Sequence, residues 1–145
     1  MSKFLVVYQS FGGKTRSLAE AAADGARSTG AQVELKEASS ADASDMAGTD
    51  GLIVATTQPF DSMAGEIKKF LEKLWIGRES VANGISFAGI VCYKTDPAET
   101  EKDIDVIIGY LGMKMVGGWL AVKEDKIETG KEPARRLGIA VAQGG

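Results

Sequence analysis

The sequence contains no histidine, only one cysteine, Cys92, and no excess of basic residues. Histidine is the commonest acid–base group at neutral pH, so its absence excludes a serine or cysteine catalytic triad of the usual kind. A single cysteine has no partner for a disulfide within the chain, which is typical of the reducing cytoplasm. If the protein is an enzyme, we expect a cofactor to carry its reaction.

The charges and the apolar segments exclude further classes of partner. The chain has 17 Lys and Arg against 20 Asp and Glu, a net charge of −3, so it lacks the basic surface that binds nucleic acid. No apolar run approaches the roughly 20 residues of a membrane-spanning helix, and no signal-peptide pattern precedes the first apolar segment. We expect no nucleic-acid partner, no membrane span and a cytoplasmic location, with residues 1–145 forming one domain.

Five apolar segments alternate with segments of helical periodicity. The first contains Phe4, Leu5, Val6, Val7 and Tyr8 in succession, which is typical of a strand buried on both faces of a parallel sheet. This alternation predicts an α/β fold with a single doubly wound, five-stranded parallel sheet. The expected strands are residues 3–9, 32–36, 51–55, 85–93 and 113–122.

Apolar residues recur at helical spacing between these strands. The clearest stripe, at offsets 0, 3, 4, 7 and 8, consists of Ile67, Phe70, Leu71, Leu74 and Trp75. We predict that this whole stripe, with Trp75, belongs to the core. The residues that mark the other helices are Leu18, Ala22 and Ala26, then Ile104, Ile107, Ile108 and Leu111, then Ala134, Leu137, Gly138 and Val141.

Two further segments have local predictions. Residues 37–48 are rich in Ser, Ala and Asp and are expected to be at most weakly helical. Asp96 precedes Pro97, and Glu99 follows three residues later, which is typical of a helix start. We therefore predict a capping role for Asp96 in preference to a catalytic one.

The loop of residues 10–15 carries the strongest functional signal. Ser10, Phe11, Gly12, Gly13, Lys14 and Thr15 connect the first strand directly to a helix that begins near Thr15. The N–H groups at a helix N-terminus have no partner within the helix, and the helix dipole places partial positive charge there. Glycines let the main chain close around an oxyanion, so the loop predicts a phosphate site.

Two common nucleotide patterns do not match this loop. The triphosphate pattern G-x-x-x-x-G-K-[ST] would need a glycine at Tyr8, and the dinucleotide pattern G-x-G-x-x-G fails because Gly12 and Gly13 are adjacent. A short loop suited to one terminal phosphate is left. The alternative is an ordinary strand-to-helix turn in which Ser10 or Thr15 only caps the helix.

Two more loops are expected at the same edge of the sheet, since ligands of such sheets bind at the carboxyl ends of the strands. The loop after the third strand contains Thr57, Gln58, Pro59 and Phe60, and the loop after the fourth begins with Tyr93, Lys94 and Thr95. A phosphate loop flanked by aromatic and amide groups predicts a mononucleotide with a flat ring. Phe60 has an alternative role, as a hydrophobic staple against the following helix.

These segments resemble the flavodoxin-like family over nearly the whole chain. Residues 8–15 with 18–20 are similar to that family's strand, loop and helix for the phosphate of FMN, and residues 56–60 with 63–65 and 69–71 are similar to the second flavin loop of its quinone-reductase branch. Residues 111–118 resemble the segment that links the fourth helix to the last strand. The resemblance implies the strand order 2-1-3-4-5 and FMN as cofactor.

The resemblance also implies roles for individual residues. Phosphate binding falls to Ser10, Gly12, Gly13, Lys14 and Thr15, with Phe11 lining the loop; ring contacts fall to Thr57, Gln58, Pro59, Phe60 and Asp61, and also to Tyr93 and Thr95. The third loop lacks the glycine-rich pattern of electron-carrier flavodoxins, and the chain lacks the extra loop material and the histidine of the quinone-reductase branch.

Three functions are therefore open. The first is an FMN-binding electron carrier that acts with a redox partner protein. The second is a reductase that passes hydride from NAD(P)H through FMN to a quinone or a flavin, and the third is a flavin-free regulatory or binding module. The short chain favours the carrier because 145 residues leave little room for a nicotinamide pocket, whereas the second loop favours the reductase.

Overall fold

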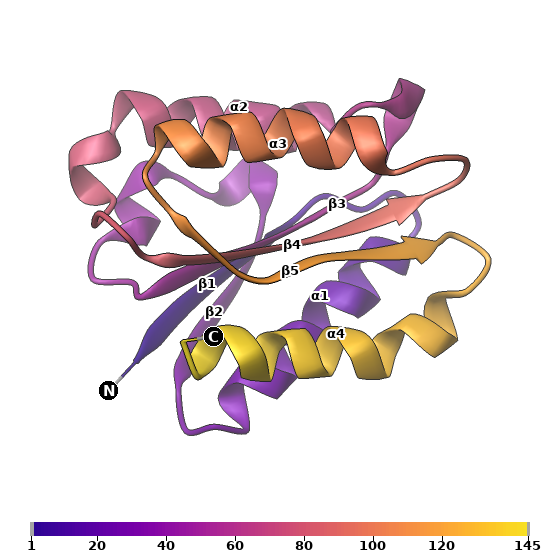
Figure 1. Ribbon diagram of the computed structural model, residues 1–145, viewed down its shortest axis with the longest axis horizontal. Helices are drawn as coiled ribbons and strands as arrows, with labels where there is room; N and C mark the ends of the chain where they lie inside the picture. Colours follow the sequence, from indigo (N-terminus) through magenta and orange to yellow (C-terminus); the bar gives the residue numbers. More distant parts are fainter. Residues whose placement is uncertain (1, 145) are drawn as a thin grey trace.

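Five parallel strands form the centre of the molecule in the order β2-β1-β3-β4-β5, in a computed structural model that describes residues 2–144 (Figure 1). The topology confirms the predicted fold class and strand order. The strands are β1 (Lys3–Tyr8), β2 (Gln32–Glu37), β3 (Gly51–Thr56), β4 (Ser86–Tyr93) and β5 (Lys114–Lys123).

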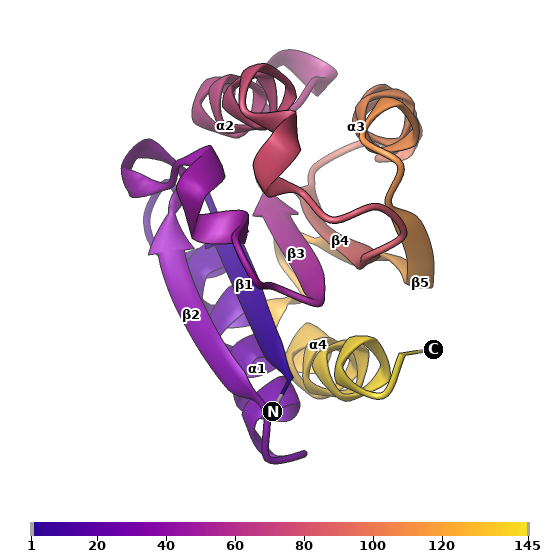
Figure 2. The same ribbon diagram turned by 90° about the vertical axis from the view of Figure 1, so that its left-hand side faces the viewer.

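Two helices cover each face of the sheet, as Figure 2 shows. Helices α1 (Lys14–Arg27) and α4 (Ile127–Ala142) pack on one face, and α2 (Gly65–Ile76) and α3 (Ala98–Tyr110) pack on the other. No helix in residues 2–144 is both long enough and apolar enough to cross a membrane.

The inner strand β1 explains why the core has two halves. Successive side chains of a strand point to opposite faces, so Phe4 and Val6 pack with α1 and α4, while Leu5 and Val7 pack with α2. All four are at most 2 % exposed. A continuous apolar run is therefore the pattern expected of a strand covered on both sides.

Trp75 corrects one prediction. The other four residues of the α2 stripe are fully buried, but the Trp75 side chain is 42 % exposed. It lies at the C-terminal end of α2, where its ring meets Tyr110 edge to face at a centroid distance of 6.0 Å instead of entering the core. The helical spacing identified the buried face of α2 correctly, but it did not show that the C-terminal end of this face is partly exposed.

The two local predictions agree with the structure. Of residues 37–48, Glu37 ends β2 and the rest contain only two short 3-10 helices, η1 (Ala38–Ser40) and η2 (Ala43–Met46). Asp96 accepts a hydrogen bond at Oδ1 from the Ala98 amide (3.0 Å) and so satisfies one free N–H group at the start of α3. The residue at the N-cap position itself is Pro97.

Helices α1 and α4 lie close together because a glycine of each helix faces the backbone of the other. A Cβ atom built on Gly138 would lie 1.9 Å from the carbonyl oxygen of Ala22, and one on Gly25 would lie 1.9 Å from that of Arg135. Only residues without a side chain permit this approach. The contact matters for function because α1 begins at the loop of residues 10–15.

We expect Gly138→Ala to lower the free energy of unfolding by roughly 1–3 kcal/mol, because the added methyl group forces the two helices apart. Gly109→Ala is the matched control, since a Cβ atom on Gly109 of α3 meets nothing within 4 Å. That control should leave stability unchanged or raise it by about 0.5–1 kcal/mol. Urea unfolding followed by circular dichroism measures both, and equal stability of the two variants would contradict the packing argument.

Candidate functional site

The carboxyl ends of the strands meet at one edge of the sheet, on the right of Figure 1, where four loops surround a cavity of about 300 Å³. The loops follow β1, β3, β4 and β5. Six of the predicted site residues line this cavity together with three that were not predicted. The lining residues are Phe11, Lys14, Thr15, Thr57, Gln58, Pro59, Cys92, Lys94 and Glu124.

The loop after β1 has the conformation that the sequence predicts for an anion site. Gly12 (φ 81°) and Gly13 (φ 94°) both adopt left-handed backbone angles, and the Gly13 amide donates to Ser10 Oγ (3.1 Å). Helix α1 begins directly afterwards, and the N–H groups of Lys14 and Thr15 are not hydrogen-bonded to another group in residues 2–144. These N–H groups and the positive end of the helix dipole are therefore available to an anion.

Two buried hydroxyl groups lie in the same cavity. Thr15 is fully buried, and neither its Oγ1 nor the buried Oγ1 of Thr57 has a hydrogen-bond partner in the part of the chain that the structure describes. A buried polar atom without a partner costs about 1–3 kcal/mol, so such atoms are rare outside sites that bind something. Both hydroxyls therefore indicate a polar ligand.

The loop after β3 is held by Thr56 at its base. Thr56 Oγ1 accepts a hydrogen bond from the Ala64 amide (3.0 Å) and donates to the Thr57 carbonyl (2.7 Å), which fixes the two ends of the loop relative to each other. Between them, Phe60 (φ 55°) and Asp61 (φ 60°) adopt left-handed backbone angles that are unfavourable for residues other than glycine. Strain of this kind is often found at binding sites.

Phe60 points into solvent. Its side chain is fully exposed, so the alternative role as a hydrophobic staple against α2 is wrong. Phe11, on the loop after β1, is also largely exposed. Two aromatic rings on loops next to one cavity supply surfaces against which a flat ring can stack.

The loop after β4 is tied to the loop after β3. Thr95 Oγ1 donates to Asp61 Oδ1 (3.2 Å), and Gln58 Nε2 donates to the Asp96 carbonyl and to Thr100 Oγ1 of α3. The amide of Gln58 thus links loops that are 38 residues apart in sequence. Ser10, Gly12, Gly13, Phe60, Asp61 and Thr95 lie on the loops around the cavity, and half-buried Tyr93 ends β4.

Three lining residues were not predicted: Cys92, Lys94 and Glu124. Cys92 lies two residues after Ile90 on β4, so it points to the same face of the sheet, and Glu124 directly follows β5. Burial raises the pKa of the Cys92 thiol and the Glu124 carboxylate acts in the same direction, whereas the nearby Thr15 hydroxyl and the Lys14 ammonium group oppose this shift. Ligands bind at the carboxyl ends of parallel strands, so the loop after the fifth strand was also a candidate, and it begins with Glu124.

The charges around the cavity favour an anionic ligand. Lys14 and Lys94 contribute two ammonium groups to the lining, against the single carboxylate of Glu124. The N-terminus of α1 adds partial positive charge at the side of Thr15. The carboxylate lies on the loop after β5, which also borders an open depression beside Gly12 and Gly13.

The family model described as Flavodoxin matches residues 6–138. The chain belongs to the flavodoxin family. This match spans the loop of residues 10–15, the loops after β3 and β4, and most of α4. Membership of this family implies a flavin cofactor, and the glycine loop, the two buried hydroxyls and the aromatic rings suit one.

Relatives of two kinds resemble the chain in sequence. It is 33 % identical over 143 residues to an NAD(P)H dehydrogenase (quinone) of Cupriavidus metallidurans, in a match that covers 81 % of this chain and 71 % of that protein. It is 29 % identical over 160 residues to a flavodoxin of Aquifex aeolicus, covering 99 % of this chain and 86 % of that one.

Two solved structures of similar fold are flavodoxins that this chain covers almost completely. An archaeal flavodoxin superimposes with a TM-score of 0.84 at 22 % identity, over 98 % of this chain and 97 % of that one. The flavodoxin of Streptococcus pneumonia TIGR4 also gives 0.84, at 24 % identity, over 99 % and 100 % of the two chains. These similarities establish the fold, which adds no large insertion to the flavodoxin core.

Proposed function

We propose that this protein is an electron carrier that binds FMN in the cavity at the carboxyl ends of its strands and exchanges electrons with a redox partner protein in the cytoplasm. The observation that carries the proposal is a pair of buried hydroxyls that have no hydrogen-bond partner among residues 2–144 and lie beside a glycine loop at a helix N-terminus. When bound, the flavin supplies the redox chemistry, and the residues of this chain bind it, orient it and set its electrostatic surroundings.

The phosphate of FMN is assigned to the loop after β1. Its ligands would be the amides of Gly12, Lys14 and Thr15, with the hydroxyl groups of Ser10 and Thr15 and the Lys14 ammonium group, while the Gly13 amide would hold Ser10 Oγ beside them. Left-handed glycines bring the main chain close to the anion without a side chain in the way. Hydrogen bonds to a charged group contribute about 1.5–3 kcal/mol each, so this end of the cofactor would supply much of the affinity.

The isoalloxazine ring is assigned to the space between the loops after β3 and β4. Thr57, Gln58 and Pro59 line the cavity there, and the exposed ring of Phe60 would border the flavin. Asp61, Tyr93 and Thr95 are the remaining residues that we propose near the ring. The hydrogen bond from Thr95 to Asp61 holds the two loops together, which would limit their movement when the flavin changes charge.

An NAD(P)H-dependent quinone or flavin reductase is the second candidate. It is favoured by the relatives that are named NAD(P)H dehydrogenase (quinone), among them the protein from Cupriavidus metallidurans. The carrier is preferred because the match to the flavodoxin of Aquifex aeolicus covers 99 % of this chain and 86 % of that protein, whereas the match to the protein from Cupriavidus metallidurans covers 81 % and 71 %. A flavin-free module is disfavoured because the two hydroxyls would then stay buried without a hydrogen bond, which lowers the stability of the protein.

We expect Thr15→Val to weaken FMN binding about tenfold to a hundredfold, because the variant removes one hydrogen bond to a charged phosphate. The stability of the flavin-free protein should stay the same or rise, since the lost hydroxyl has no partner among residues 2–144. Fluorescence titration with FMN and urea unfolding without FMN measure the two effects.

Thr49→Val is the matched control for this experiment. The Thr49 side chain is also buried, but its Oγ1 donates to the Met46 carbonyl (2.8 Å). Thr49 precedes β3, whereas the loops around the cavity follow the strands. This variant should lose about 1 kcal/mol of stability and keep its FMN affinity. If Thr15→Val binds FMN as tightly as the unmodified protein does, the phosphate assignment is wrong.

Anaerobic reduction separates the two candidate functions. For a carrier, we expect stoichiometric NADPH alone to bleach the flavin slowly, while dithionite bleaches it at once, because a carrier receives its electrons from a partner protein and not directly from NADPH. Absorbance spectroscopy of the FMN-loaded protein follows both reactions. Rapid bleaching by NADPH, with a quinone restoring the yellow form over many turnovers, would establish the reductase instead.

A further inference from the structure

Lys94 lines the flavin cavity from the loop after β4. It directly follows Tyr93, the last residue of that strand. Its side chain is exposed, and its ammonium group forms no ion pair with a carboxylate of residues 2–144. Without such a partner, this positive charge is available to a negatively charged ligand in the cavity.

Hydrogen bonds hold the loop on both sides of Lys94. Before it, the Tyr93 carbonyl accepts a hydrogen bond from the Glu124 amide (2.8 Å) of the loop after β5. After it, Thr95 Oγ1 donates to Asp61 Oδ1 (3.2 Å) of the loop after β3. The point at which the Lys94 side chain leaves the main chain is therefore fixed relative to both neighbouring loops.

The other two charged residues of the cavity lining lie on the loops after β1 and β5. Lys14 belongs to the loop assigned to the phosphate, where the negative charge of that group would balance its ammonium group and the N-terminus of α1. Glu124 also borders the open depression beside the same loop. Among the lining residues in the described part of the chain, Lys94 is the cation that remains for the ring.

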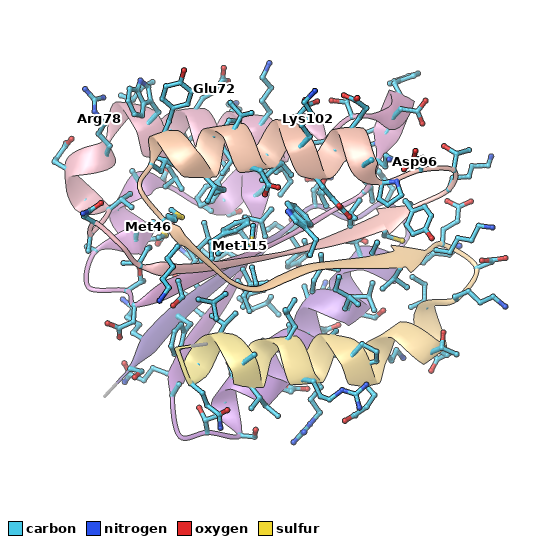
Figure 3. All side chains as sticks on the ribbon, viewed as in Figure 1. Met46, Glu72, Arg78, Asp96, Lys102 and Met115 are labelled. Carbon is cyan, nitrogen blue, oxygen red and sulfur yellow. The ribbon has the colours of Figure 1, made fainter. Side chains whose placement is uncertain are left out.

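Two carboxylates lie on the loops beside Lys94, but both have other partners. Asp61 Oδ1 accepts the hydrogen bond from Thr95, and Asp96 Oδ1 accepts one from the Ala98 amide (3.0 Å). Figure 3 shows Asp96 at the end of the helix layer where these loops lie. Neither carboxylate lines the cavity or forms an ion pair with Lys94.

Reduction changes the charge of a flavin ring. The oxidised ring is neutral, whereas the uptake of two electrons from a donor and one proton from water leaves one negative charge on the ring. A cation beside the ring therefore stabilises the reduced form more than the oxidised form. Because a group that favours one state shifts the equilibrium toward it, such a cation raises the reduction potential.

We propose that Lys94 raises the reduction potential of the bound flavin by holding its ammonium group beside the ring. The inference rests on the proposed function, since it requires FMN in the cavity. Lys94 makes the protein a readier acceptor of electrons and a weaker donor. The partner that the protein reduces must then have a higher potential than a carrier without this charge would need.

Neutralising this side chain in the FMN-loaded, full-length protein tests the proposal. Lys94→Met keeps an unbranched side chain and removes the charge, so the preference for reduced over oxidised FMN should fall about tenfold. This change corresponds to a two-electron potential about 30 mV lower, measured by anaerobic titration against a reference dye. Lys94→Arg keeps the charge and should keep the potential. At about 1 M salt the difference between K94M and the unmodified protein should shrink, because salt screens an exposed charge.

Lys114→Met is the matched control. Lys114 is exposed and begins β5, so it lies at the opposite edge of the parallel sheet from the cavity. This variant changes the net charge by the same amount and should leave the potential unchanged.

Three results would overturn the role of Lys94 alone: FMN that binds K94M with an unchanged potential, a K94R variant that shifts as far as K94M, or an equal shift in the Lys114 control. Fluorescence titration of the unmodified protein with oxidised FMN separates this failure from that of the proposed function. If the unmodified protein does not bind FMN, the proposed function and the role of Lys94 are both wrong.

Discussion

The N–H groups at the start of α1 have to be satisfied by something outside their own helix, and this constraint organises the whole functional edge of the protein. The first turn of any helix leaves such donors free. Here Gly12 and Gly13 turn the chain so that the helix begins immediately after β1, and no acidic side chain occupies its first turn. With Thr15 buried and its hydroxyl unpartnered among the described residues, a bound phosphate is the simplest group that completes the site.

The rest of the fold holds this helix terminus in place. Glycines at positions 25 and 138 let α1 lie directly on α4, and the continuous apolar run of β1 fixes the strand from which the loop emerges. The loops after β3 and β4 are then joined by the side chains of Gln58 and Thr95. The packed helices and β1 thus position the proposed phosphate site, while the hydrogen-bonded loops border the proposed ring site.

Local sequence patterns predicted most of the fold and the glycine turn after β1 because those features depend on neighbouring residues. Periodicity gave the five strands and the helix faces, and the adjacent glycines gave the turn. Three features depend on contacts between distant segments. Trp75 is partly exposed because α3 does not cover the end of α2. Glu124 lies at the cavity because β5 pairs with β4. The hydrogen bond from Gln58 to Thr100 joins residues that are 42 positions apart. No local pattern encodes these contacts.

The central claim is that the phosphate group supplies a large part of the affinity for the cofactor, and a comparison of FMN with riboflavin tests it most directly. Isothermal titration of the flavin-free protein with each compound, in a buffer without phosphate, isolates the contribution of that group. If two or more charged hydrogen bonds form at residues 10–15, FMN should bind at least about a hundredfold more tightly than riboflavin. Equal affinity for the two compounds would contradict the account.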